Sequence, residues 1–110
     1  MILVDHFYIF DNANSAGESN LIKNSNGDKI VIQIDGDAVG FSIQLKGSII
    51  AGSNDFYEIT GFDLASQSSD TINENGIYTF NIEGIPYLKL DLVSISSGSL
   101  SAYAEIIKKY

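Results

Sequence analysis

The chain has a single histidine, His6, and this is the first residue to consider for acid–base or nucleophilic chemistry. Asp5 and Asp11 lie close to it in the sequence. A catalytic nucleophile or base must also be held in position by a third group. Nothing in the sequence around His6 supplies that group. We therefore expect an ordinary surface or core histidine, and we predict no catalytic residues and no enzyme activity.

Acidic residues could bind a hard cation such as calcium, which takes several oxygen ligands from loops. Asp35 and Asp37 flank a glycine, and further oxygens could come from Asp55, Asp63 or Asp70. The spacing does not match the standard calcium-binding loop, and aspartates beside a glycine are ordinary in turns. The 14 acidic residues also single out no carboxylate pair for glycoside hydrolysis. We predict no metal ligands and no cofactor.

Aromatic residues offer a better candidate for binding. Phe56, Tyr57 and Phe62 lie in a long, mostly polar segment, where their rings could stack on the face of a sugar or contact a partner. Single exposed aromatic residues are also normal, so these rings could simply cover the ends of the fold. Both interpretations stay open at this point.

A second aromatic group lies near the two ends of the chain. Tyr8, Phe10 and Tyr103 fall opposite the expected core positions of the terminal strands. Large side chains on both faces of a strand need cover from something besides one core, and a second copy of the chain would provide it. We predict a possible oligomer interface at these three residues, and hence a homo-oligomer.

The elements that would position these residues are strands, because apolar residues occupy alternate positions along most of the chain. This alternation predicts half-buried strands in "DKIVIQID", "FSIQLK", "YTFNIE", "LKLDL" and "LSAYAEI". The first residues, "MILVDHFYIFDN", lack the basic start of a signal peptide and are interpreted as another strand. The stretch "SAGESNLIKN" could form at most a short helical turn.

Turns between the strands are marked by glycine, asparagine and serine. We interpret "DGD", Asp35 to Asp37, as the turn of a hairpin between two strands, and expect further turns at "NSNG", "ENG" and "SSGS". The segment from Ile49 to Asn75 is expected to be a long excursion between sheets. Short alternating strands with such turns predict an all-β fold, an antiparallel β-sandwich of jelly-roll or galactose-binding-like type. The length of 110 residues fits one domain, residues 1–110.

Composition excludes several classes of partner. The net charge is −8 and all six basic residues are lysines without a basic patch, so we predict no nucleic-acid binding. The absence of cysteine excludes disulfides and thiolate metal sites. No apolar run approaches the roughly eighteen residues of a membrane span, so no membrane insertion is predicted.

The last two-thirds of the chain resemble a known family. The ordered series "LKGSIIAGSNDFYEI" and "FDLASQSSDTINENGIYTFNIEGIPYLKLDLVSISSGSLSAYAEI" is similar to small β-sandwich proteins of tailed bacteriophages, which are described as structural or head-associated virion proteins. The chain lacks the tryptophan common in the aromatic loop of that family and the arginines of its penultimate strand. The ending "LSAYAEI" is also similar to the last strand of galactose-binding-like sandwiches. The matching residues are Gly47 and Ser48, Phe56 and Tyr57, Thr71, Gly76 and Tyr78, Gly84, Lys89, and Ser97 to Ser99.

The resemblance implies a function that needs no catalytic group. We expect a non-enzymatic virion structural protein that decorates the capsid or serves as a head or tail accessory component. Its partners would be copies of itself and other phage virion proteins. It would be made in the host bacterial cytoplasm and end in the virion. The alternative is a carbohydrate-binding module that recognises host-surface glycans through the aromatic residues Phe56, Tyr57 or Phe62.

Overall fold

Strands make up most of the fold in this computed structural model. The structure describes residues 2–52, 55–59, 61–63, 68–69 and 71–108, and the side chains of residues 6–52, 55–59 and 71–108. The strands are β1 (Ile2–Ala13), β2 (Gly17–Glu18), β3 (Ile22–Lys23), β4 (Lys29–Gly36), β5 (Ser42–Ser48), β6 (Tyr57–Glu58), β7 (Gly61–Asp63), β8 (Ser68–Ser69), β9 (Gly76–Asn81), β10 (Tyr87–Ser94) and β11 (Leu100–Lys108).

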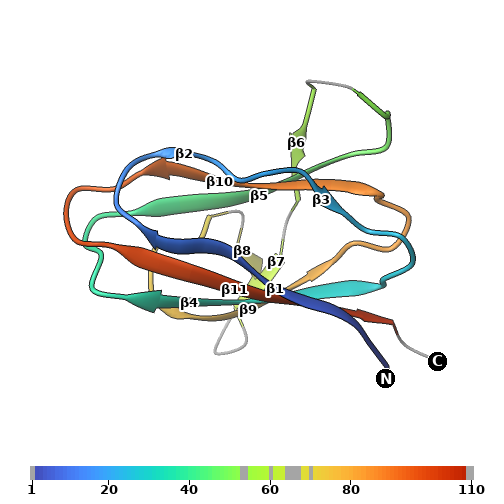
Figure 1. Cartoon of the computed structure of the whole chain (residues 1–110), viewed down its shortest axis with the longest axis horizontal. Helices are drawn as coiled ribbons and strands as arrows, with labels where there is room; N and C mark the ends of the chain where they lie inside the picture. Colours follow the sequence, from blue (N-terminus) through green and yellow to red (C-terminus); the bar gives the residue numbers. More distant parts are fainter. Residues whose placement is uncertain (1, 53–54, 60, 64–67, 70, 109–110) are drawn as a thin grey trace.

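The strands form two antiparallel sheets that pack face to face (Figure 1). The first sheet has the order β1-β11-β4-β9-β7-β8. The second has the order β2-β10-β5-β6, and β3 pairs with β10 beyond β2. The prediction of an all-β antiparallel sandwich is confirmed. Strands pair mostly with partners distant in the sequence, as when β1 lies beside β11 near the other end of the chain.

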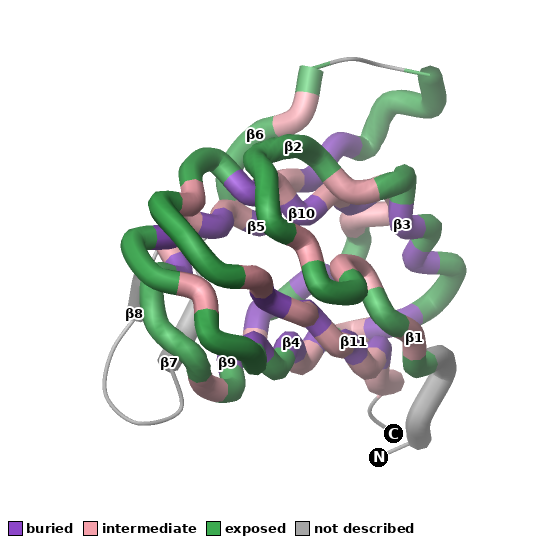
Figure 2. The backbone as a smooth tube through the Cα atoms, turned by 60° about the vertical axis from the view of Figure 1, so that its left-hand side comes forward, coloured by how far each residue is buried: buried purple, intermediate pink, exposed green. Residues whose placement is uncertain are grey.

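The core lies between the sheets and follows directly from the alternation in the sequence. In β4 and β11 every second residue is buried, because successive side chains of a strand point to opposite faces. The same pattern in β5 and β10 supplies the facing layer from the second sheet. Figure 2 shows the buried segments along both sheets and the exposed loops around them. The largest fully buried side chains are Phe80, Ile30, Ile32, Ile34, Ile43, Leu45, Ile72, Ile82, Leu88, Leu90, Leu92 and Leu100.

The predicted hairpin at Asp35–Asp37 is wrong. Strands β4 and β5, on either side of this turn, belong to different sheets. Both hydrogen-bonding edges of β4 are already taken, one by β11 and the other by β9, so β5 has no edge to join. The turn therefore carries the chain across the sandwich, and β5 pairs with β10.

A second crossing loop, between β10 and β11, packs against the first. The Ser99 N–H donates to Asp37 Oδ1 at 3.0 Å, and the Asp37 N–H donates to the Ser99 carbonyl at 3.1 Å. Gly98 has a φ of 76° and lies so close that a Cβ there would come within 2.5 Å of the Asp37 carbonyl oxygen. Asp37 and the Gly98–Ser99 turn thus join two sheet-crossing loops at one end of the sandwich.

A short helical turn was expected in "SAGESNLIKN", and the structure has two short strands there instead. Strands β2 and β3 pair with β10 at the edge of the second sheet. Tertiary pairing overrides the weak helical propensity of this stretch. By contrast, the expected excursion from Ile49 to Asn75 does pass between sheets, since β6 belongs to the second sheet and β7 to the first.

The buried side chain of Asn24 connects the loops at the other end of the sandwich. Its Nδ2 donates to the carbonyls of Gly27, Ile82 and Ile85 at 3.1–3.2 Å. Its Oδ1 accepts the Gly27 N–H at 2.7 Å, which fixes the orientation of the amide. Asn24 is only 7% exposed. One amide therefore joins the turn before β4 to the connection between β9 and β10.

On the outer face of the second sheet, Lys46 of β5 forms an ion pair with Asp91 of β10, with Nζ and Oδ2 2.9 Å apart. The two side chains are 23% and 18% exposed. The hydrogen bond to Asp91 raises the pKa of Lys46 above 10.5, its charge adds to this effect, and burial opposes it. A raised lysine pKa means that the charged form is favoured by folding.

This pair predicts a pH-dependent loss of stability. We expect Lys46→Met to lower the free energy of unfolding by about 1 kcal/mol near pH 7. The contribution of Lys46 is complete below its unfolded-state pKa and is lost as the pH rises through the higher folded-state value. The difference between wild type and variant should therefore shrink above pH 10.5. Urea denaturation at a series of pH values measures it. Lys23→Met, at an exposed lysine, is the control, and a constant difference at high pH would contradict the prediction.

Candidate functional site

The tip of the hairpin between β5 and β6 exposes large apolar side chains. Ile49 is 73% exposed, Ile50 63% and Tyr57 74%. We call these three residues the hairpin patch. Figure 1 shows this hairpin projecting from the body of the sandwich at β6. The strands below the tip are held in register, with Lys46 opposite Glu58 and Gly47 opposite Tyr57.

The hairpin patch borders a surface hollow whose base is apolar. Ile59 and Ile85 are partly buried and pack against the core, and both line the hollow. They approach closely over Gly47, where a Cβ would come within 2.8 Å of each side chain. Asp55 and Glu58 are the charged residues of the lining. The result is an exposed apolar surface with an acidic rim.

Phe56 has different surroundings from its neighbour Tyr57. The Lys89 ammonium lies 4.8 Å from the centre of the Phe56 ring, a cation–π contact, and is 4.0 Å from Glu18 Oε1. Tyr57 lines the hollow on the hairpin, and Phe56 does not. The backbone of Phe62 pairs with Thr79 and Ser68, while its side chain lies outside the described residues. Ligand or partner contact at Phe56, Tyr57 and Phe62 stays a prediction.

A second surface lies on the outer face of the first sheet, where β1, β11 and β4 run side by side. Tyr8, Tyr103 and Gln33 stand opposite one another across these three strands. In the next outward-facing row, Ser101 stands opposite Asp35. We call this surface the outer groove. It is lined by Tyr8, Asp11, Asn12, Gln33, Asp35, Gly36, Ser101 and Tyr103.

The two tyrosines form one aromatic group. Their ring centres are 5.2 Å apart and the rings meet edge to face at 74°, a preferred geometry for aromatic pairs. Tyr8 is 65% exposed, and Tyr103 is half-buried. The structure does not place Phe10 with them. A register shift between Tyr8 and Phe10 turns Phe10 towards the core, against which it packs. The role of the three residues in an oligomer interface stays a prediction.

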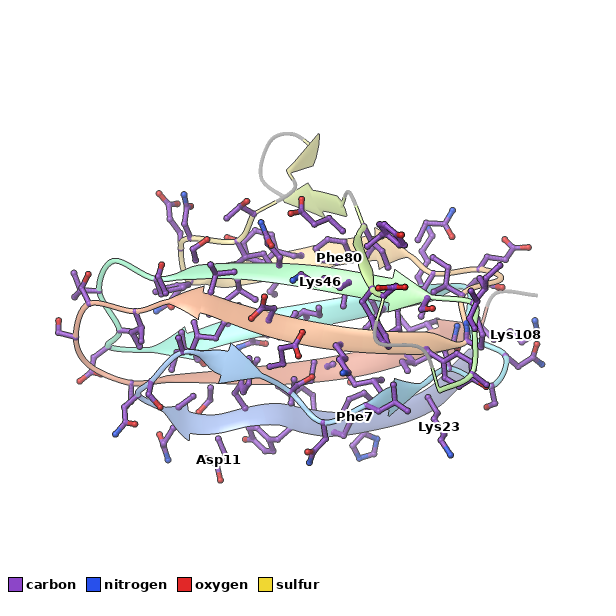
Figure 3. All side chains as sticks on the ribbon, turned by 90° about the horizontal axis from the view of Figure 1, so that it is seen from above. Phe7, Asp11, Lys23, Lys46, Phe80 and Lys108 are labelled. Atoms are coloured by element: carbon purple, nitrogen blue, oxygen red, sulfur yellow. The ribbon has the colours of Figure 1, made fainter. Side chains whose placement is uncertain are left out.

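Asn12 shapes one end of the outer groove. Its φ of 54° is positive, a conformation that asparagine adopts more readily than most residues. The pairing of β1 with β11 shifts register here, between Phe10 and Ala13. The Asn12 N–H donates to Ser101 Oγ at 3.0 Å, and its side-chain amide donates to Asp11 Oδ1 at 3.2 Å. This irregularity places polar groups beside the aromatic pair, and Figure 3 shows Asp11 on the solvent side of β1.

The residues first considered for catalysis or metal binding are placed as follows. The His6 ring lies 6.3 Å from the Tyr103 ring on the outer face of the first sheet. The Asp37 carboxylate accepts a hydrogen bond from the Ser99 N–H in the loop between β10 and β11, and Asp35 lies in the outer groove. Within the part of the chain that the structure describes, no three histidine, cysteine or acidic side chains gather in a group that could hold a metal ion.

Sequence reasoning missed Ile49 and Ile50. The available signal was the pair of adjacent isoleucines directly after the alternating strand, because one of two adjacent residues must leave the core face. The outer groove was missed because its residues come from three distant segments. Only the register of β1, β11 and β4 brings them together.

The fold and a family model identify the chain's relatives. Residues 4–105 match the model of the XepA family. The chain belongs to the XepA family. No curated protein matches it. Within the described part of the chain, no helix has the length and apolar character needed to cross a membrane.

Two solved structures share this fold. The SPBc2 prophage-derived protein YomS has a TM-score of 0.84 at 16% identity, and the match covers 96% of this chain and 95% of YomS. The PBSX exported protein XepA has a TM-score of 0.85 at 19% identity, over 93% of this chain. This chain spans 37% of the length of that XepA protein. At these identities the likeness concerns the fold.

Proposed function

We propose that this XepA-family chain is a non-enzymatic phage structural protein, a capsid decoration or a head or tail accessory component, that attaches to the particle through the hairpin patch. The family match and the likeness to a prophage-derived protein support a phage protein with an all-β fold. The observation that carries the attachment role is the gathering of Ile49, Ile50 and Tyr57, each more than 60% exposed, on one projecting hairpin.

Apolar residues gathered on a surface are typical of interaction sites. Burying one such side chain in an interface contributes about 1.5–3 kcal/mol. Tyr57 adds a rigid aromatic ring with a polar end, a type of residue enriched where binding energy concentrates. The hairpin patch therefore has the composition of a small docking surface.

The charges around the patch favour a protein partner over a lipid surface. Asp55 and Glu58 line the hollow beside it, and in the part of the chain that the structure describes no lysine does. Peripheral membrane proteins attract anionic lipids with lysine and arginine, and carboxylates at this position would be repelled. The partner we propose is a phage virion protein with an apolar socket.

The attachment is tested by adding purified protein back to particles of a phage that lacks the gene. Wild-type protein should co-sediment with the particles at a saturable ratio. A variant with Ile49→Asp and Ile50→Asp should lose at least about tenfold in affinity, because charges cannot enter an apolar socket. Both positions are exposed, so we expect stability to change by about 0.5 kcal/mol or less.

The matched control is Val39→Asp. Val39 is 61% exposed and lies in the loop between β4 and β5, away from the hairpin. It should bind the particles like wild type. Equal binding by the Ile49→Asp/Ile50→Asp variant, or an equal loss in the control, would contradict attachment through the hairpin patch.

A further inference from the structure

We propose that the outer groove binds a neutral saccharide, which stacks on Tyr8 and Tyr103 and forms hydrogen bonds with the polar side chains beside them. The groove lies on the first sheet, whereas the hairpin patch is at the edge of the second. This binding activity therefore goes beyond the attachment role and can exist together with it.

The aromatic pair suits one face of a sugar ring. A pyranose has an apolar C–H face and a rim of hydroxyls, and aromatic side chains provide apolar contact with little loss of conformational entropy. Tyr8 as a whole is 65% exposed, so the residue is accessible to a ligand from solvent. Because the two rings meet at 74°, they form adjoining walls, and a sugar on one ring would have its edge against the other.

The polar side chains suit the hydroxyl rim of the same sugar. Gln33 lies directly across from Tyr103, and Asp35 follows on the same face of β4. Gln33 Nε2 donates to Asp35 Oδ2 over a long 3.4 Å, which uses only part of the capacity of a carboxylate and an amide. Asp11 and Asn12 complete the rim on the β1 side. A few placed polar groups beside an apolar surface are typical of small-molecule sites.

Charge restricts the ligand to a neutral one. Asp11 and Asp35 line the groove, no lysine among the described residues does, and the whole chain has a net charge of −8. Phosphates and sialylated or uronic-acid sugars would be repelled. A quaternary ammonium ion could stack on the rings, but it has no N–H or O–H groups to satisfy the carboxylates and amides. A neutral polyhydroxylated ring can contact the tyrosine rings and can also form hydrogen bonds with the carboxylates and amides.

The same charges disfavour the alternative of a self-interface at Tyr8 and Tyr103. In a twofold interface the same patch meets itself, so Asp11 and Asp35 of one copy would face those of the other. Like charges brought together and desolvated oppose association. A sugar carries no such charge and leaves the carboxylates free to accept hydrogen bonds from its hydroxyls.

Binding is tested with an array of neutral oligosaccharides of glucose, galactose, mannose and N-acetylglucosamine, with sialylated oligosaccharides and choline chloride as comparisons. Hits are quantified by calorimetric titration. We expect at least one neutral oligosaccharide to bind with an affinity of roughly millimolar or better. Tyr8→Ala and Gln33→Ala should each weaken binding about tenfold or more, and Tyr8→Phe should bind nearly like wild type. Tyr57→Ala, an exposed tyrosine on the hairpin, should leave the affinity unchanged.

Urea denaturation shows that each variant is folded before it is titrated. The proposal is overturned if no neutral oligosaccharide binds, if choline or the sialylated set binds in preference, or if only Tyr57→Ala weakens binding. A change of oligomeric state in Tyr8→Ala without a change in sugar affinity would also overturn it, in favour of a self-interface. None of these results bears on add-back to particles, so failure of the groove and failure of the attachment role are separable.

Discussion

Asn24→Asp is expected to lower the free energy of unfolding by about 3 kcal/mol or more at pH 7. The substitution keeps the shape of the side chain and the acceptor for the Gly27 N–H. It replaces the amide that donates to the carbonyls of Gly27, Ile82 and Ile85 with a carboxylate oxygen. That oxygen would then face three other oxygens at a site only 7% exposed. The repulsion and the desolvated charge both disfavour the folded state.

The pH dependence of this variant separates the effect of the introduced charge from the loss of the amide's hydrogen bonds. Burial and neighbouring carbonyls raise the folded-state pKa of the introduced carboxyl, so its protonated form, which can donate one hydrogen bond, is favoured by folding. The destabilisation should therefore be large at neutral pH, decrease as the pH falls through the raised folded-state pKa, and reach its minimum below the unfolded-state value of about 4. Asn24→Ala, which loses the bonds without adding charge, should cost about 1–3 kcal/mol with little pH dependence. Urea denaturation of Asn24→Asp that matches wild type at pH 7 would contradict the role of Asn24.

Phe80→Ala should cost about 3–5 kcal/mol. Phe80 is 2% exposed and lies in β9, where it is paired with the buried Ile30 of the neighbouring strand β4. Removing the ring leaves a cavity between the two sheets, and strands held on both sides cannot move in to fill it. A total stability of about 5–15 kcal/mol is typical of small domains, so this one substitution removes a large part of it.

The measurement is urea denaturation, in which the midpoint should fall while the slope of the unfolding free energy against urea concentration stays unchanged. Tyr57→Ala removes an aromatic ring that is 74% exposed and should change stability by about 0.5 kcal/mol or less. If the two variants were equally stable, the assignment of Phe80 to a single core shared by both sheets would be contradicted.

The strands and their buried faces could be predicted because alternation is a local property. In β4, β5, β10 and β11 the burial of side chains follows from their parity in the sequence, except at some strand ends. The all-β antiparallel sandwich follows from several such segments with turn residues between them. The structure confirms this architecture, and the two solved structures reported above share it.

Strand partners could not be predicted, because alternation gives the face of a strand but not its neighbour. The glycine and aspartates at Asp35–Asp37 indicate a turn, and a turn that crosses between sheets has the same residues as a hairpin. Strand β4 lies between β9 and β11, each far away in the sequence. The hairpin interpretation was wrong for this reason, although the location of the turn was right.

Sites that depend on strand pairing were hidden for the same reason. Tyr8 and Tyr103 were recognised as outward-facing, yet their contact with each other and with Gln33 depends on the order β1-β11-β4. The bond from Asn24 to Gly27 is local and lies in the turn expected at "NSNG", whereas the bonds of Asn24 to Ile82 and Ile85 connect distant parts of the sequence. Phe56 and Tyr57 are adjacent in the sequence, and they have separate surroundings in the structure.

The two exposed surfaces fit a protein that is fixed at one side and presents the other. The hairpin patch extends from the second sheet, and the outer groove lies on the outer face of the first. A particle-bound copy would therefore leave the groove accessible to solvent. This arrangement is part of the proposal, and it requires that the chain be found on particles.

The most direct test of that requirement is quantitative mass spectrometry of density-purified phage particles from cells that produce this chain. The proposed function predicts that the polypeptide is present in intact particles at a fixed ratio to the major capsid protein. A high ratio corresponds to capsid decoration, and a few copies per particle correspond to a head or tail accessory position. Absence from intact particles, with the chain present in the same lysate, would contradict the proposed structural role.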